Sequence, residues 1–235
     1  MTGARFDART GRLEASRAQI EALLTLEDPA AVAGLEEAGA VIDGQLHDAL
    51  ADALDATRSP VCELGLERGD RRGRGWVSER LAVLLVPAGE GRVALHQTAP
   101  AFLPDMLARM NDVAPRPRVE PAVRLRYGPG DLARVLAARD AAEAARLAGP
   151  DKQAAAAAAL LVRALREHWR VEVSWDAAPG SPGVRALEVL DSDAGVWLVI
   201  PDGAAVELWP STPTMVFRLL TGLLPLDHEI VRSRA

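Results

Sequence analysis

The chain has 235 residues, of which 49% are hydrophobic, and it can therefore bury a full core as one large domain or as two closely packed halves. A formal net charge of −6 argues against general binding to nucleic acid or to an anionic membrane, because an acidic surface repels phosphate. The single cysteine, Cys62, excludes an intrachain disulfide and a cysteine-based zinc site, and fits a reducing compartment. The segment from Met1 to Ser16 has no apolar core, and no apolar run approaches the ~18 residues of a membrane span. We therefore expect a cytoplasmic protein without membrane insertion.

Helices dominate the beginning of the chain. A short extended piece at 12–14 is followed by Ser16 and Gln19, a capping-box pattern that opens an amphipathic helix. A short helix is expected from Asp28 to Gly39, and a further helix over 44–58.

From Cys62 onward the apolar period changes from 3.6 to 2, which predicts half-buried antiparallel strands. We expect strands around 62–67, 81–86 and 92–96, and glycine-rich turns at 68–75 and 89–91. Pro100 then predicts the start of a closing helix.

The second half is predicted to repeat this order. It is expected to contain an extended piece at 123–126, helices from Asp131 and over about 151–168, strands at 171–175, 184–200 and 206–209, and a closing helix from Pro213. The predicted organisation is an N-terminal half at 1–113, a proline-rich connector at 114–122, a C-terminal half at 123–226 and a polar, flexible tail at 227–235.

The two halves also match residue by residue at an offset of about 112 residues. Leu13 corresponds to Leu125, residues 83–86 correspond to 196–199, and Pro100 corresponds to Pro213 at offsets of 112 and 113. A period this long is not that of a solenoid, whose repeats have roughly 20 to 50 residues. It predicts an internal duplication with pseudo-two-fold halves, each made of helices, an antiparallel meander and a closing helix.

No motif in the chain indicates catalysis. The nucleophile elbow, the phosphate-binding loop and the dinucleotide fingerprint are all missing, and Asp191 and Asp193 fall where a turn is expected. The four histidines have no metal-ligand spacing; they are His47, His96, His168 and His228. We therefore predict a binding protein without catalytic residues, metal or cofactor. The alternative is an enzyme or small-ligand binder with a site between the halves, and a further possibility is a structural dimer formed by sheet-edge pairing.

Four arginines crowd an expected hairpin tip and have two interpretations. They are either a solvated loop or a cationic contact for an acidic partner, and they are Arg68, Arg71, Arg72 and Arg74. Trp197 is out of phase with its apolar neighbours, so we expect Trp197 and Trp76 to be more exposed than Trp175 and to join this partner surface.

Two stretches resemble the EspG family of actinobacterial type VII (ESX) secretion. The first is Glu37–His47, EAGAVIDGQLH, followed by an amphipathic helix and Ser59-Pro60. The second is Leu190–Val199, LDSDAGVWLV, followed by Val206–Trp209 and a closing helix.

The resemblance implies an α+β fold with a central antiparallel sheet and helical bundles packed on it. It also implies a cytosolic chaperone, not an enzyme, that binds PE–PPE heterodimers, keeps them soluble and delivers them to the secretion machine. We expect the protein itself to be a monomer or a homodimer. The family's loop between its second and third strands contacts the substrate, and residues 68–75 occupy that place here. On this basis the four arginines are the candidate partner-binding residues.

Overall fold

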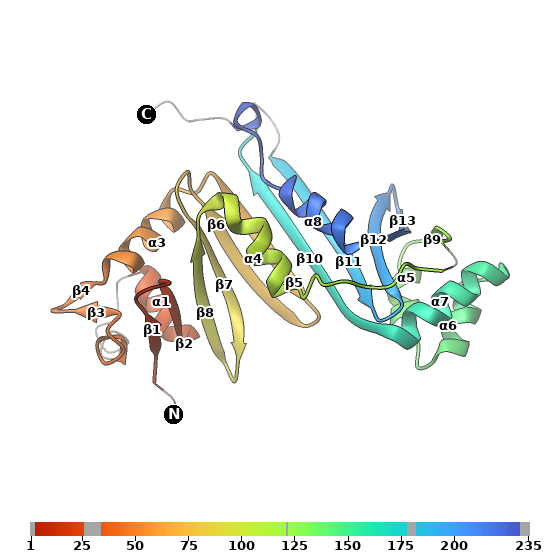
Figure 1. The fold of residues 1–235 in the computed structure, drawn as a ribbon, viewed down its shortest axis with the longest axis horizontal. Coiled ribbons are helices and arrows are strands. Elements are labelled where there is room, and N and C mark those ends of the chain that lie inside the picture. Colours follow the sequence, from red (N-terminus) through yellow and green to blue (C-terminus); the bar gives the residue numbers. More distant parts are fainter. Residues whose placement is uncertain (1–2, 26–33, 121, 178–181, 231–235) are drawn as a thin grey trace. The chain divides into compact units, whose positions relative to one another are not determined.

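The structure is a computed structural model, and it describes residues 3–25, 34–120, 122–177 and 182–230. The chain forms two compact units, each built on antiparallel strands (Figure 1). The first unit contains Met1–Met106, Glu172–Arg185 and Leu224–Ala235, and the second contains Leu107–Val171 and Ala186–Leu223. These units do not coincide with the halves expected from the sequence repeat, because two long strands contribute residues to both of them.

The first unit has the strand order β1-β2-β8-β7-β6-β5, with the end of β10 beside β5. Its strands are β1 (Arg5–Asp7), β2 (Arg12–Ser16), β5 (Cys62–Arg68), β6 (Arg71–Val77), β7 (Ala82–Gly89) and β8 (Arg92–Thr98). A separate two-stranded hairpin, β3 (Val41–Ile42) and β4 (Gln45–Leu46), lies between β2 and β5 in the chain. The helices α1 (Arg17–Thr25) and α3 (Asp48–Arg58) belong to this unit.

The second unit has the strand order β10-β11-β12-β13-β9. Its strands are β9 (Leu125–Tyr127), β10 (Leu165–Trp175), β11 (Gly183–Ser192), β12 (Gly195–Asp202) and β13 (Ala205–Ser211). Its helices are α5 (Asp131–Leu136), α6 (Ala141–Leu147), α7 (Lys152–Ala164) and α8 (Pro213–Thr221). The helix α4 (Leu103–Met110) follows the short 3-10 helix η1 (Pro100–Phe102), and a second 3-10 helix, η2 (Asp227–Glu229), lies near the C-terminus. The α+β class and the antiparallel sheet are confirmed.

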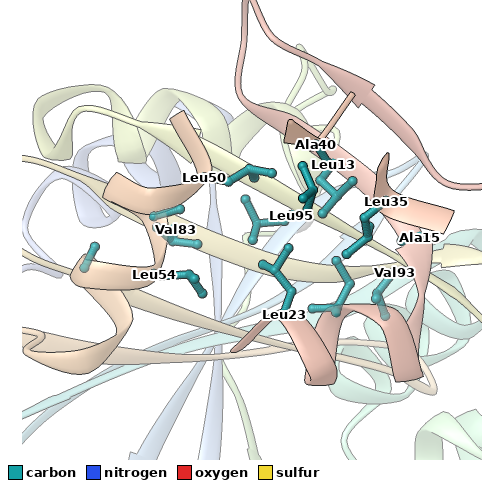
Figure 2. Packing of buried hydrophobic residues seen from close by; sticks show 14 of the residues in the cluster. Leu13, Ala15, Leu23, Leu35, Ala40, Leu50, Leu54, Val83, Val93 and Leu95 are labelled. Atoms are coloured by element: carbon teal, nitrogen blue, oxygen red, sulfur yellow. The ribbon is translucent and has the colours of Figure 1, made fainter. Parts of the chain in front are cut away.

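Each unit has its own hydrophobic core. In the first, α1 and α3 bury apolar side chains against β2, β7 and β8 (Figure 2). Leu50 and Leu54 of α3 lie one turn apart and face Val83 and Leu95 across this core. In the second, helices α5, α6 and α7 supply apolar side chains to a cluster that contains Trp197 and Leu208. Burial of these faces is the main favourable contribution to folding.

Local sequence signals account for the helix starts. Gln19 accepts a hydrogen bond from the backbone N–H of Ser16 at 3.0 Å, and Ser16 Oγ accepts one from the N–H of Gln19 at 3.2 Å. This confirms the predicted capping box. Asp151 caps α7 and Thr212 caps α8 in the same way, each through a side-chain oxygen that accepts from a backbone N–H.

Two predicted helix boundaries are wrong. The helix expected over 44–58 begins only at Asp48, because Asp43 and Gly44 have φ values of 52° and 73° and form the turn between β3 and β4. The helix expected to reach His168 ends at Ala164, and β10 begins at the next residue. The helix expected from Asp28 starts outside the described residues.

The two predicted halves share one strand order, except that β1 at the edge of the first has no counterpart in the second. β5 to β8 form a meander followed by η1 and α4, and β10 to β13 are followed by α8. An earlier strand pairs with the last strand of each meander, with Leu13 opposite Leu95 and Leu125 opposite Leu208. These pairs keep the offset of the sequence repeat, as duplication would require, while the duplication itself stays a prediction. No helix among the described residues is both long enough and apolar enough to cross a membrane.

Candidate partner-binding surface

The β5–β6 hairpin carries the four candidate arginines. Its strands pair from end to end, and a two-residue turn begins at Gly69, which has a φ of 58°. The turn is therefore much shorter than the loop predicted over 68–75. Because side chains alternate between the faces of a sheet, Arg72 and Arg74 lie on one face and Arg68 and Arg71 on the other. The four arginines thus do not form one cationic cluster.

The face that carries Arg72 and Arg74 contains both signs of charge. Arg72 forms an ion pair with Glu67, which is directly opposite in register, and Arg74 lies 3.8 Å from a carboxylate oxygen of Glu63. These four side chains are half or more exposed. We call Glu63, Glu67, Arg72 and Arg74 the charged face of the hairpin. A partner that binds here must match alternating charges, since the surface is not uniformly basic.

A glycine flattens the middle of the charged face. Gly65 is exposed between Glu63 and Glu67, and an added Cβ would lie 4.0 Å from the Cβ of Glu172 in the neighbouring strand β10. The backbone at Gly65 is therefore accessible to another chain. Such a flat polar surface suits contact with a helix end or loop of a partner.

The opposite face of the hairpin belongs to the folded core. A Cβ added to Gly75 would lie 2.5 Å from Leu84 Cδ2 and 3.1 Å from the carbonyl oxygen of Val83. Leu64, opposite Gly75, is 3% exposed. Neighbouring side chains fill the space above this glycine, so the base of the hairpin is held firmly in the sheet.

Three of the five tryptophans have an exposure predicted from the sequence, and the structure differs from that prediction most clearly at Trp197. Trp197 is 0% exposed within the core of the second unit, whereas Trp175 is 8% exposed, so the prediction for Trp197 is wrong. Trp76 is 9% exposed and packs in the core of the first unit, with the guanidinium of Arg74 5.4 Å from its ring centroid. Trp76 lies on the same face of β6 as Arg74 and packs beside it, between the charged face and the core. A contact of Trp197 with a partner would require the core of the second unit to open.

A groove of about 550 Å³ lies in the second unit, between the start of α5 and the sheet. Its apolar lining consists of Leu132 and Leu136 of α5 with Val199 and Val206 of the strands, and the loop at 128–130 forms one wall. A volume of this size can hold several apolar side chains of a docked helix or loop.

Polar side chains border this groove. His168 Nε2 lies 2.8 Å from Glu188 Oε1, and Arg170 Nη1 lies 3.7 Å from the other oxygen of the same carboxylate. His168 and Glu188 line the groove directly. Sequence reasoning missed this pair because it placed His168 at a helix end. The alternation of polar residues with Trp169, Val171 and Val173 was the available signal.

Among the described residues, surfaces that could bind a partner are more evident than side chains that could act in catalysis. They contain no group of three His, Cys, Asp or Glu side chains positioned to hold a metal ion. Burial raises the pKa of the Cys62 thiol to about 12, so at neutral pH it is protonated and a poor nucleophile. Burial also lowers the pKa of His96.

No protein-family model matches the chain, and no curated protein matches its sequence. Among solved structures, the Mycobacterium tuberculosis type VII secretion system chaperone EspG5, determined in complex with the PE25–PPE41 dimer, matches with a TM-score of 0.63. The alignment covers 94% of this chain and 100% of the matched chain, at 14% sequence identity. The chain has the fold of EspG5. This likeness confirms, at the level of the fold, the EspG resemblance inferred from Glu37–His47 and Leu190–Val199.

Proposed function

We propose that the chain is a type VII secretion-associated chaperone that binds helical PE/PPE-like proteins in the cytosol and keeps them soluble for export. The observation that carries this proposal is the EspG5 fold over 94% of the chain, since the EspG5 structure contains a bound PE25–PPE41 dimer. Likeness of fold alone leaves the client open, and surface chemistry must supply it.

Two surfaces support a helical client. The charged face of the β5–β6 hairpin presents paired, exposed charges around Gly65, and the groove of the second unit presents apolar side chains bordered by His168 and Glu188. Apolar contact supplies affinity, while matched charges select the partner and set its orientation. In this proposal the arginines and the groove contact the client, and Trp76 supports Arg74.

The first test is capture of the client. The affinity-tagged chain is expressed in its native host, and the proteins that co-purify with it are identified by mass spectrometry. We expect a secreted helical protein of PE or PPE type in about equimolar amount. Recovery of no such protein, while each PE–PPE-like pair of the host also fails to bind on co-expression, would contradict the proposed function.

The second test locates the contact at the hairpin. Reversing the charge of three hairpin arginines should weaken client binding tenfold or more, roughly 1.4 kcal/mol, because an attraction to the client becomes a repulsion. The control reverses three exposed arginines elsewhere in the first unit and should bind normally. The hairpin variant carries Arg71→Glu, Arg72→Glu and Arg74→Glu; the control carries Arg5→Glu, Arg9→Glu and Arg17→Glu. Equal binding by the two variants would exclude the hairpin as the contact.

The groove is tested separately by filling it. Ala133 and Ala137 line the groove and are exposed, so Ala133→Glu with Ala137→Glu adds bulk and charge there without removing a buried side chain. Ala142→Glu with Ala156→Glu, at exposed positions of α6 and α7, is the matched control and adds the same number of charges. Titration calorimetry with the captured client should show a loss of binding only for the groove variant. Loss in both variants with unchanged folding would point to a general charge effect.

A further inference from the structure

The sheet of the second unit has another face, opposite the groove. Paired residues of antiparallel strands share a face, so Trp209 of β13 lies beside Leu198 of β12, and Glu207 lies beside Ile200. Their side chains alternate with Leu208, which belongs to the core shared with α5, α6 and α7. This second face therefore has no residue in common with the groove or with the charged face of the hairpin.

The helix α8 covers only part of this face. Its Val216 lines a small cavity with Val189 of β11 and Val196 of β12, which are on the same face as Trp209. Trp209 itself is only half-buried, and Arg124, which comes just before β9, is exposed. The edge of the face at β13 and β9 is therefore partly open to solvent.

An exposed guanidinium is held in place at this edge. The guanidinium carbon of Arg124 lies 3.8 Å from the centroid of the Trp209 ring. Trp209 Nε1 in turn donates a hydrogen bond of 2.8 Å to the carboxylate of Glu207, which fixes the ring. Because the stack already restricts the guanidinium, Arg124 would lose little freedom on binding a further group.

The carboxylates of this edge are already paired, whereas Arg124 is not. Asp202 and Glu207 both contact Arg126 Nη1, at 2.5 and 3.4 Å. The guanidinium of Arg124 has no ion pair or hydrogen bond with any residue that the structure describes. Its N–H groups are therefore available to a carboxylate from outside the chain, to which a planar guanidinium can donate two parallel hydrogen bonds.

Apolar side chains and a second cation are exposed on α8. Met215, Phe217 and Leu219 are 44%, 40% and 37% exposed. Arg218 is exposed as well, and it forms no ion pair within the described parts of the chain. Exposed apolar side chains gathered on one helix are typical of a surface that binds another chain. The unpaired charges on this face are positive, although the whole chain has a net charge of −6.

We propose that this face binds an acidic, partly apolar segment of a partner protein. We call Arg124, Ile200 and Trp209, with the exposed side chains of α8, the Trp209 surface. A carboxylate of the segment accepts hydrogen bonds from the stacked guanidinium of Arg124, and apolar side chains beside it contact Trp209 and Ile200. The free positive charges select an acidic segment over a basic one. The inference goes beyond the proposed chaperone function, because it assigns a partner to a face that the proposed client contacts do not use.

The test is an NMR titration of the isotope-labelled full chain with unlabelled peptides. Each of the five tryptophans has one indole N–H signal, and Trp209→Phe identifies the signal of Trp209. A peptide of alternating glutamate and leucine should shift this signal until it saturates, whereas a peptide of alternating lysine and leucine should not. A peptide of alternating glutamate and serine should bind severalfold more weakly, because it buries less apolar surface. Raising the salt concentration from 50 mM to 500 mM should weaken binding of the acidic peptide, since salt screens exposed charges.

Matched variants distinguish the position of the cation from its charge and shape. Arg124→Gln should weaken binding of the glutamate–leucine peptide about tenfold. Arg124→Lys should weaken it severalfold, because lysine keeps the charge but lacks the planar fork. Arg163→Gln and Arg163→Lys are the controls and should bind normally, since Arg163 is also exposed but lies on α7, which packs on the other face of the sheet. Both positions are exposed, so the thermal unfolding midpoints should stay close to that of the parent.

Three outcomes would overturn the proposal. The first is an equal shift of the Trp209 signal by the acidic and basic peptides, or unchanged binding of the acidic peptide by Arg124→Gln. The second is loss of that binding on filling the groove with Ala133→Glu and Ala137→Glu, which would place the peptide in the groove. The third is self-association of the parent chain in analytical ultracentrifugation that Arg124→Gln abolishes, since the occupant would then be a second copy of this chain.

Discussion

The turn between β5 and β6 and the turn between β11 and β12 use charge in opposite ways. At the first, Arg72 and Glu67 pair across the strands with side chains that are 67% and 50% exposed. At the second, Arg116 of the connector at 114–122 donates two hydrogen bonds, of 2.9 and 2.8 Å, to the carboxylate of Asp191 in β11. Both side chains are less than 10% exposed. An exposed pair is available to a partner, whereas a buried pair holds the fold.

The environment of the buried pair explains its rigidity. Arg116 also donates to the carboxylate and the carbonyl oxygen of Asp112, which satisfies more of its N–H groups. Val119 of the same connector covers Gly195 at the start of β12. The connector is thus fastened to the second unit by one charged and one apolar contact. Substitution of a charged residue in this buried pair would destabilise the fold, whereas the exposed charged residues of the hairpin can be substituted at little cost in stability.

The largest effect is expected from breaking the buried pair. Arg116→Ala should destabilise the protein by about 3–5 kcal/mol, because it leaves the Asp191 carboxylate buried and without its partner. Urea unfolding followed by circular dichroism would measure the change. Arg118→Ala, at an exposed position of the same connector, is the control and should stay within about 0.5 kcal/mol of the parent. Equal stability of the two variants would show that the connector does not fasten the unit.

A smaller effect is expected at Gly195. Its φ of 132° disfavours any side chain, and a Cβ there would lie 2.5 Å from Val119 Cγ2. Gly195→Ala should therefore cost about 2–4 kcal/mol, from backbone strain and overpacking together. Gly203→Ala has a positive φ of 61° but no atom within 4 Å, so it should cost only about 1 kcal/mol. Thermal unfolding of the two variants would distinguish the cost of the contact with Val119 from the cost of backbone strain. Equal unfolding midpoints would show that the contact with Val119 does not contribute.

Local sequence patterns predicted most helices and strands, but they could not predict contacts between residues far apart in the chain. The Ser16–Gln19 capping box could be recognised because its partners are three residues apart. The turn at Asp43 and Gly44 also has a local signal, an Asp-Gly pair directly after the apolar residues Val41 and Ile42, but the helix prediction took precedence over it. The Arg116–Asp191 pair spans 75 residues, so Asp191 looked like a turn residue only.

The exposure of side chains was harder to predict from the sequence than their alternation between the two faces of a strand. Trp197 lies out of phase with Val196 and Leu198, as expected, but both sets of residues are buried because each face of β12 is covered. Period-2 patterning shows which residues share a face and cannot show whether that face is covered. The candidate arginines were correctly placed on a hairpin, while their distribution over two faces depends on the register of β5 and β6.

The smallest effect on stability is expected from the exposed pair, Glu67 and Arg72. A double-mutant cycle with Glu67→Ala and Arg72→Ala should give a coupling of about 0.2–1 kcal/mol, because solvent screens the attraction and both side chains lose freedom on pairing. Urea unfolding of the four proteins at 50 mM and 500 mM salt would measure it, and the coupling should nearly vanish at high salt. Arg72→Ala should nevertheless weaken binding of the client, although it has little effect on the free energy of unfolding. A coupling above about 2 kcal/mol that persists at high salt would make the charged face a structural element. Its arginines would then be poor candidates for recognition, since charges that the fold requires are not free to be matched to a partner.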